Sequence, residues 1–218
     1  MHKSRITAAA IAGVTAAMMF GAPALADDGT VLTADSPAGP AVAVGDTISS
    51  GLATGTQAVF ATAPAGSNGM KCAGSSLSAV VNDNPAAPGA ATLGANLGLS
   101  SCTVSGIVGV TGVNSVTINN QPYATTTASD GTVSVAGTAT APISATLNLR
   151  TLLGSVTCVF VASGNAITGV ADNTDNSITF TDQQFVKSTG PAACIANAYF
   201  TAKYTPVVTS AGSPVFVN

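Results

Sequence analysis

The densest group of side chains able to bind a ligand is the segment 172–177, which reads Asp-Asn-Thr-Asp-Asn-Ser. Carboxylate and amide oxygens are the ligands that Ca²⁺ prefers, so Asp172 and Asp175 form a weak candidate metal site. The EF-hand pattern fails, because Thr174 stands at the third position and Gln183 replaces the glutamate of the twelfth. Asp and Asn also bond their own backbone in tight turns. We therefore expect a hairpin turn here, and neither a bound metal nor a cofactor.

Four cysteines, Cys72, Cys102, Cys158 and Cys194, form the second group. An even number in an exported chain indicates two disulfides, and three pairings are possible. Cys72 and Cys158 each precede a strand-like segment and a turn, and each half of the chain then supplies a second cysteine. We therefore predict the pairs Cys72–Cys102 and Cys158–Cys194. A redox site would need a Cys-x-x-Cys motif or an exposed thiol of low pKa, and the sequence shows neither sign.

Catalytic options are few. The only histidine, His2, lies in the N-terminal segment, and the chain has no Glu and no Trp. Without imidazole, neither a Ser-His-Asp nor a Cys-His site can form, and a glycosidase pair would have to consist of two Asp residues. No Ser-x-x-Lys motif is present. We expect a protein that is not an enzyme and has no catalytic residues.

Two further patterns could bind a polymer. Tyr123, Tyr199 and Tyr204 could stack on sugars, but Tyr199 and Tyr204 are an odd number of residues apart, so a regular strand would turn them to opposite faces. We expect them to pack in the core or at its rim. The Thr-rich segment 125–140 could form an ordered Thr face, but its repeat is short and irregular. Solvated strand faces explain that segment.

Residues 1–26 carry the pattern of a cleavable signal peptide. His2, Lys3 and Arg5 precede an uncharged apolar run over 6–20, and Ala24-Leu25-Ala26 provides the small residues of a cleavage site. The run is shorter than the roughly 20 residues that a spanning helix needs. We expect a protein that is secreted, extracellular or associated with the cell envelope, with no membrane insertion after cleavage.

The charge of the remaining chain limits its partners. Four basic and nine acidic residues follow position 26, which gives a net charge of −5. Nucleic acids and anionic membrane surfaces both attract basic patches, so the sign argues against either as a partner. An unknown protein or a cell-envelope polymer is the partner that we expect.

The elements that position these groups are expected to be β-strands. Val, Thr, Ala, Ser, Gly and Asn dominate the chain, and apolar residues alternate over segments such as 57–62, 132–138 and 143–149. Short strands with turns at intervals of about 8–12 residues predict an all-β sandwich or Greek-key barrel. We divide the chain into a polar arm or edge strand (27–55) and two pseudo-repeated β modules (56–128 and 129–218), each with one disulfide. One continuous domain is the alternative.

Several motifs resemble a known group of proteins. Asn84-Pro-Ala-Ala-Pro-Gly89 between Cys72 and Cys102, Thr111-Gly-Val-Asn-Ser-Val-Thr117, Gly154-Ser-Val-Thr-Cys158, Asn173-Thr-Asp-Asn-Ser-Ile-Thr-Phe180 and Gly212-Ser-Pro-Val-Phe-Val-Asn218 are similar to segments of small secreted proteins of filamentous actinobacteria. That group has no assigned activity, so the resemblance carries over no catalytic residue. It implies export and a Cys-linked β domain.

These observations predict a secreted, non-enzymatic β protein that acts by binding or as a structural component at or outside the cell envelope. Two alternatives remain open. One is a module that binds a cell-wall or carbohydrate polymer, which the absence of Trp disfavours. The other is a surface-coat or self-assembling protein, since neutral, Val-rich strand edges tend to pair.

Overall fold

The computed structural model describes residues 29–218, so the expected signal peptide lies outside the described residues. These residues form strands and one short 3₁₀ turn, η1. The elements are β1 (Leu32–Ala34), β2 (Thr47–Gly51), β3 (Ala58–Ala61), β4 (Gly69–Asp83), β5 (Ala90–Ser105), β6 (Val110–Asn119), β7 (Tyr123–Ala128), β8 (Thr132–Ala136), β9 (Ser144–Thr151), β10 (Gly154–Ala162), η1 (Ser163–Asn165), β11 (Ala166–Asp172), β12 (Ser177–Thr189), β13 (Asn197–Tyr204), β14 (Val208–Thr209) and β15 (Val215–Val217).

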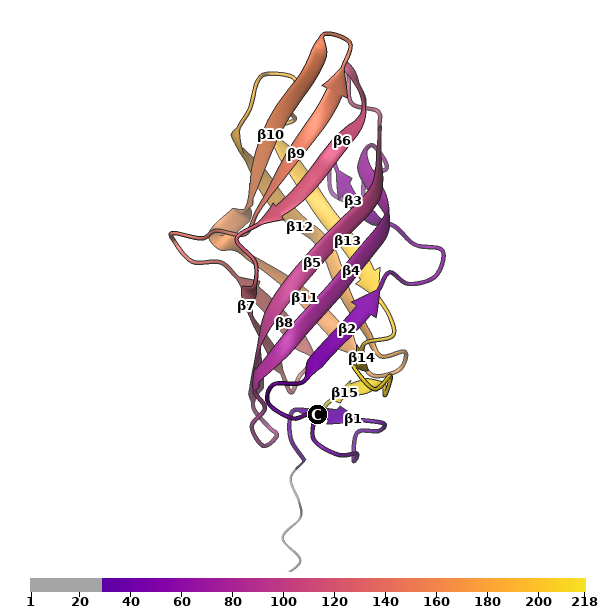
Figure 1. The fold of residues 1–218 in the computed structure, drawn as a ribbon, viewed down its shortest axis with the longest axis vertical. Helices are drawn as coiled ribbons and strands as arrows, with labels where there is room; N and C mark the ends of the chain where they lie inside the picture. The colour runs from indigo at the N-terminus through magenta and orange to yellow at the C-terminus, as the bar shows by residue number, and fades with distance from the viewer. Residues whose placement is uncertain (1–28) are drawn as a thin grey trace, which may run out of the picture.

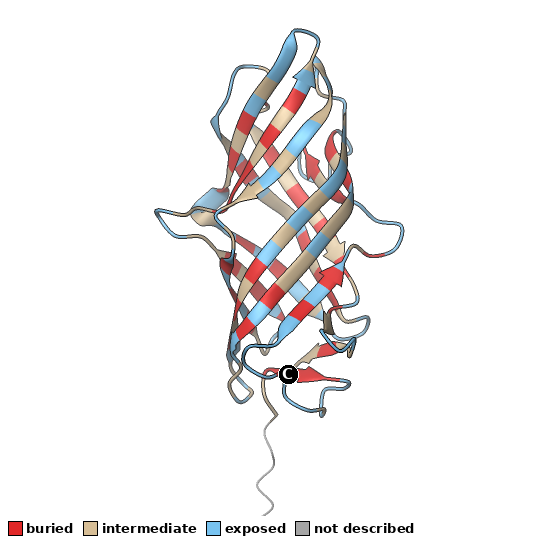
Figure 2. Cartoon of the chain, in the orientation of Figure 1, coloured by how far each residue is buried: buried red, intermediate tan, exposed pale blue. Residues whose placement is uncertain are grey.

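Alternation of buried and less buried residues explains why these segments are strands. In β13 the side chains of Ala198, Phe200, Ala202 and Tyr204 are buried, whereas the residues between them are only partly buried. Successive side chains of a strand point to opposite faces, so a period of two turns one apolar row inward. Figure 2 shows the same alternation along most of the strands. The prediction of an all-β fold is confirmed.

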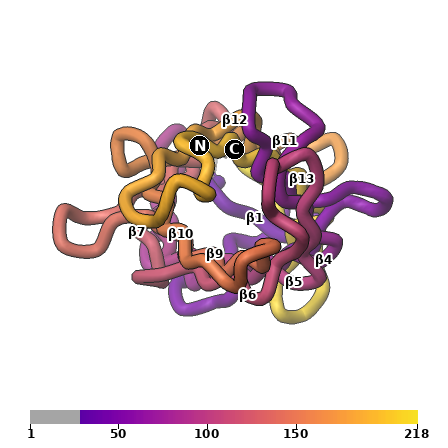
Figure 3. The backbone as a smooth tube through the Cα atoms, turned by 90° about the horizontal axis from the view of Figure 1, so that it is seen from above, coloured from indigo at the N-terminus to yellow at the C-terminus, as the bar shows by residue number. Residues whose placement is uncertain are grey.

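The main sheet closes into a barrel of eight strands. Its order is β11-β8-β7-β5-β4-β3-β13-β12, and β12 pairs again with β11. Viewed along the long axis of the molecule, the backbone runs around a common centre (Figure 3). Closure leaves the lower part of this ring without free edges, and in a barrel of this size the inward side chains fill the interior. The core is therefore the inside of the barrel.

One long strand, β12, changes its partner along its length, and another, β5, has its second partner over only part of its length. β12 pairs with β11 over Ser177–Asp172 and neighbouring pairs, and with β10 over 185–189. β5 pairs with β7 only over Ala90–Ala95. Beyond β10 the sheet continues to β9 and ends at β6. We call the end with the turns 106–109 and 152–153 the upper end, and the end with β1 and β15 the lower end (Figure 1).

Strands from both halves of the sequence share this one sheet. β3 pairs with β13, β6 with β9 and β7 with β8, so segments 56–128 and 129–218 are joined by three ladders. This arrangement corresponds to the alternative of one continuous domain. Within 27–55, β1 pairs with β15, and β2 pairs with both β4 and β14.

The two disulfides join Cys72 to Cys102 and Cys158 to Cys194. The first links directly opposed residues of β4 and β5. The second ties β10 to the loop 190–196, which follows β12. The two halves therefore differ: β4 and β5 are adjacent strands, whereas β11 and β12 intervene between the cysteines of the second half.

Aromatic side chains fill the middle of the barrel. Phe200 lies at the centre of a cluster, with ring centroids 4.8 Å from Phe60, 6.1 Å from Phe180 and 6.5 Å from Phe185. Tyr204 extends the cluster, with its ring centroid 6.4 Å from that of Phe180. The buried residues of the whole barrel form one hydrophobic cluster, which is consistent with a single core. Within residues 29–218, no helix has the length and apolar character needed to cross a membrane.

Candidate functional site

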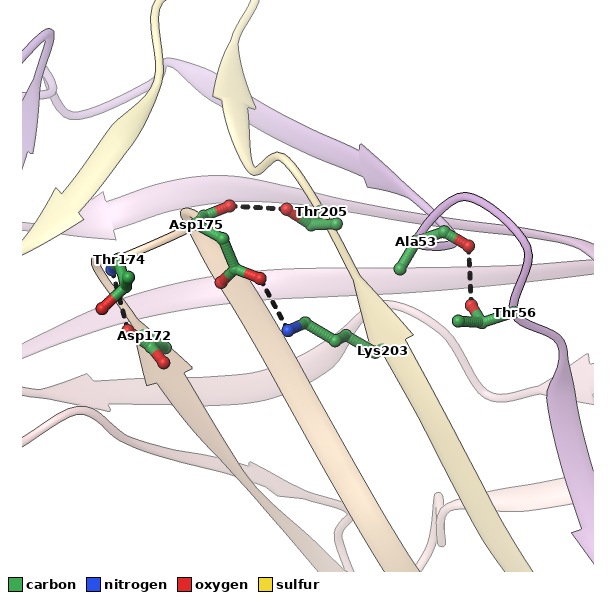
Figure 4. Close-up of polar contacts among 7 residues, drawn as sticks. All are labelled: Ala53, Thr56, Asp172, Thr174, Asp175, Lys203 and Thr205. Atoms are coloured by element: carbon green, nitrogen blue, oxygen red, sulfur yellow. Dashed lines mark hydrogen bonds and ion pairs between the residues drawn. The ribbon is translucent and has the colours of Figure 1, made fainter.

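Asp172 is the last residue of β11, and Asp175 lies in the turn that leads to β12 (Figure 4). The Asp172 carboxylate accepts a hydrogen bond from the N–H of Thr174 at 2.8 Å. Asp175 forms an ion pair with Lys203, with 2.6 Å between Oδ2 and Nζ. These contacts lower the pKa of both carboxyls: the Thr174 N–H is the main cause for Asp172, and Lys203 is the main cause for Asp175. A turn that places a lysine on one carboxylate is poorly suited to Ca²⁺.

Another carboxylate lies close to this turn. Asp130 lines a polar hollow of about 250 Å³ together with Asp172, Asn173 and Val217. The side chain of Asn173 is occupied, since it donates to the Val217 carbonyl and accepts from the Val217 N–H, at 2.7 and 2.9 Å. Asp130 accepts from the N–H of Thr132, which lowers its pKa. The polar groups of this hollow therefore serve first to hold the turns and the last strand in place.

The tyrosines do not form a platform. Tyr123 and Tyr204 are buried inside the barrel, and Tyr199 lies on the opposite face of β13. We expected the threonines of segment 125–140 to lie on solvated strand faces, and two of them do not. Thr125 and Thr127 are buried on the inward face of β7, and Thr125 Oγ1 donates to the carbonyl of Tyr123. A threonine is isosteric with valine, so its hydroxyl can bond the backbone while its methyl group packs in the core.

The structure draws attention to a different place, the seam between β5 and β6. The two strands are joined by the turn 106–109 at the upper end and diverge from it (Figure 1). Among the described residues, β6 pairs with β9 alone, and over 96–105 β5 pairs with β4 alone. Two strand edges therefore face each other without a ladder between them. Unpaired edges of this kind can accept another strand.

The lower end of the seam is closed by one side chain. The Gln121 amide accepts a hydrogen bond from the N–H of Leu97 and donates to its carbonyl at 3.1 Å. The same Nε2 donates to the carbonyl of Ile118 at 3.3 Å. Gln121 thus bonds to both strands in the way that a neighbouring strand would. Gln121 lies where the chain passes from β6 to β7. We call this point, with the hydrogen bonds of Gln121 to Leu97 and Ile118, the fork.

An apolar cavity of about 40 Å³ lies behind the fork. Leu97, Ile118 and Ala145 line it from the seam side, and the aromatic cluster lines it from the opposite wall. A second apolar cavity of about 20 Å³ lies further toward the upper end and shares Phe60 and Ala145 with the first. Both are far smaller than the roughly 150 Å³ of a cavity that holds benzene. The interior can accept a small apolar side chain, but not a free ligand of drug size.

Only two titratable groups line the larger cavity, and both are tyrosines. Burial raises the pKa of Tyr204 to about 12, although a 2.8 Å hydrogen bond with Ser75 opposes the shift. Burial also raises the pKa of Tyr123, whose hydroxyl donates to the carbonyl of Asn119. Both phenols are therefore neutral at physiological pH. The cavity is apolar and offers no acid or base that works near neutral pH.

The raised pKa of Tyr204 predicts a loss of stability at alkaline pH. The unfolded chain ionises this phenol near pH 10, whereas the folded chain keeps its proton until about pH 12. The stabilisation is complete below pH 10 and is lost as the pH rises through 12, by about 3 kcal/mol. Urea unfolding at a series of pH values checks this. In Tyr204→Phe the decline should shrink to the part contributed by Tyr123, and an unchanged decline would assign it to other groups.

The sequence does not predict the seam or the role of Gln121 in closing it. Asn120-Gln-Pro122 has the composition of a turn, and nothing in it indicates that Gln121 closes a barrel. The turn between β9 and β10 did carry a signal. Leu152 and Leu153 stand where a hairpin normally has Gly, Asn or Asp, so an apolar pair between two strands could have been noticed. Comparison of the chain with protein-family models, with curated proteins and with solved structures gives no match.

Proposed function

We propose that this is an exported, non-enzymatic binding protein whose seam takes up an extended segment of a partner protein. The observation that carries the proposal is the coincidence of two features. The hydrogen bonding of the barrel is interrupted between β5 and β6, and an apolar cavity lies behind that interruption. In strand addition, main-chain hydrogen bonds supply the affinity and pockets for alternate side chains supply the specificity.

The backbone directions of the two strands support this proposal. The N–H and C=O of Leu97 point into the seam, because Gln121 bonds both of them. Direction alternates along a strand, so Leu99 faces the seam as well. On β6, the Ile118 carbonyl faces the seam and Val116 follows by the same alternation. Gln121 already bonds Leu97 and Ile118, so an extended segment above the fork would bond Leu99 on one edge and Val116 on the other.

The side chains along the seam also suit an apolar guest. Leu97, Leu99, Val116 and Ile118 are only partly buried, and all four pack against the core. Residues further down the same interior, such as Leu93 and Ala95, are fully buried. Covering the partly buried row would contribute roughly 25 cal/mol for each Å² of apolar surface removed from water. A partner would therefore bury apolar surface in the upper half of the barrel, whereas the corresponding surface of the lower half is already buried.

Export supports the proposal from the sequence side. Two disulfides and an N-terminal segment with a signal-peptide pattern fit a protein that functions in an oxidising compartment outside the cytoplasm. Detection of the chain beginning at Asp27 in the culture medium or in the cell-envelope fraction would test this part. A chain that keeps residues 1–26 inside the cell would contradict it.

Selection of peptides tests the seam directly. Random nine-residue peptides displayed on phage and selected on the disulfide-bonded protein should yield sequences that alternate apolar and polar residues. Val116→Pro removes one N–H that faces the seam, and proline is tolerated on a free strand edge. We expect about tenfold weaker binding of a selected peptide by this variant, the effect of losing one hydrogen bond. Isothermal titration measures it.

Val116→Ala is the matched control, because it shortens the same side chain but keeps the N–H. It should bind the peptide within about threefold of the wild type. Amide hydrogen exchange should show protection by the peptide over 97–105 and 110–119. Failure to select any peptide, or equal binding by Val116→Pro, would refute the seam as a binding site. If the bound segment came from a second copy, light scattering would show a dimer that Val116→Pro abolishes.

A further inference from the structure

Three large apolar side chains project into solvent at the upper end. Val108 is 96% exposed, Leu152 81% and Leu153 101%. They lie in two neighbouring turns, 106–109 and 152–153, which are joined by a hydrogen bond from the N–H of Leu152 to the carbonyl of Gly109 at 3.4 Å. Single exposed apolar residues are ordinary, whereas a contiguous exposed apolar patch indicates an interaction surface. We call these three residues the apolar tip; Figure 1 shows the two turns at the upper end.

The charges of the barrel are unevenly divided between its ends. Within residues 29–218, the upper half carries Lys71, Arg150 and Lys187 with one acid, Asp182, near the middle. The lower half carries one lysine and six aspartates, which are Lys203, Asp35, Asp46, Asp83, Asp130, Asp172 and Asp175. The upper half thus has a net charge of +2 and the lower half −5.

Because the charges are divided in this way, the net acidic charge of the chain does not argue against an anionic ligand at the upper end. A strand of 15 residues such as β4 is about 50 Å long at about 3.3 Å per residue. The Debye length at physiological ionic strength is about 8 Å. The acidic lower end is therefore screened from whatever the apolar tip touches. Arg150 lies two residues before Leu152, so a ligand at the apolar tip meets a basic residue.

The shape of the tip favours a lipid surface over a protein. Its side chains are aliphatic, they stand on two convex turns, and two of them are almost fully exposed. A protein partner would need a concave, matching pocket, whereas the boundary between lipid headgroups and acyl chains accepts any convex apolar group. Binding at that boundary grows with buried apolar area and with attraction of basic residues to anionic lipids.

We propose that the apolar tip docks on the surface of an anionic phospholipid bilayer, with Val108, Leu152 and Leu153 at the level of the upper acyl chains. Arg150 then lies close to the lipid phosphates. The contact is peripheral and involves only the two turns, so the upper end of the barrel faces the membrane and the lower end faces away from it. This inference does not depend on the proposed role of the seam.

Co-sedimentation with vesicles tests the proposal. The full protein is mixed with vesicles of phosphatidylglycerol and phosphatidylcholine in equal parts, or of phosphatidylcholine alone. We expect preferential binding to the anionic vesicles, and about tenfold weaker binding by the Leu152→Ser, Leu153→Ser double variant. Arg150→Gln should weaken binding to the anionic vesicles only, and added salt should reproduce that effect in the wild type.

Val170→Ser is the matched control, because Val170 is 60% exposed but lies on β11, in the lower half. Its vesicle binding should equal that of the wild type. A wild type that binds no vesicle, or a double variant that binds as well as the wild type, overturns the proposal. So does a tip that mediates contact between copies, which light scattering would reveal as a dimer abolished by the double variant.

Discussion

Replacing Phe200 by alanine is expected to lower the free energy of unfolding by about 4 kcal/mol. Phe200 is almost completely buried on the inward face of β13 and contacts Phe60, Phe180 and Phe185. Truncation removes the apolar surface of the ring and leaves a void that these rigid neighbours cannot fill. The void would also merge with the cavity behind the fork, which Phe200 lines. Urea denaturation followed by circular dichroism measures the change.

Tyr199→Ala provides a control on the adjacent residue of the same strand. Tyr199 is only partly buried and faces away from the core, so its replacement should cost about 1 kcal/mol or less. Both variants change β13 by removal of one aromatic ring, and only the direction of the side chain differs. Equal losses in the two variants would show that the barrel interior is not the main source of stability.

Removal of the Cys158–Cys194 disulfide is expected to destabilise the protein by about 4 kcal/mol. The bond closes a loop of 36 residues, and its loss enlarges the ensemble of unfolded conformations. It is also the covalent attachment of the loop 190–196 to β10. In the Cys158→Ala, Cys194→Ala variant we therefore expect faster proteolytic cleavage within this loop, in addition to a lower urea midpoint.

The other disulfide separates these two effects. Cys72–Cys102 closes a loop of similar size, with a separation of 30 residues, so its removal should cost about the same. Its cysteines, however, lie opposite each other in a long ladder that holds β4 and β5 together without the bond. The Cys72→Ala, Cys102→Ala variant should lose stability but resist cleavage at 190–196. If both variants were cleaved there equally, the local role of the second disulfide would be refuted.

The sequence predicted strands well because the interior is apolar along most of its length. In β13 and β8, alternation of side chains is regular enough to identify both the strand and its inward face. The pairing of the cysteines could also be predicted, because each half of the chain has the same order of strand, turn and second cysteine. The polar and acidic segment at 172–177 has the composition of a turn, and a turn is what the structure has there.

The closure of the barrel could not be predicted in this way. It depends on β12 pairing with β11 as well as with β13. The later change of partner from β11 to β10 accompanies an irregular register between Phe180 and Gln183, which has no distinct composition. The seam depends on Gln121, a single polar residue within an ordinary turn. The division of charge between the two ends of the barrel could not be predicted from the sequence either. Net charge is a sum over the chain, whereas the division between the two ends requires knowing which end each turn occupies.

The pairing of β1 with β15 has a consequence for protein engineering. Asn218 donates to the carbonyl of Thr30 at 3.1 Å, so residues 30 and 218 are neighbours at the lower end. A short linker could join them, and the chain could then be opened between Leu152 and Leu153 to give a circular permutant. Such a molecule would keep every ladder of the barrel and would carry its new ends at the opposite apex. A fluorescent label on either end would then report contacts of that apex directly.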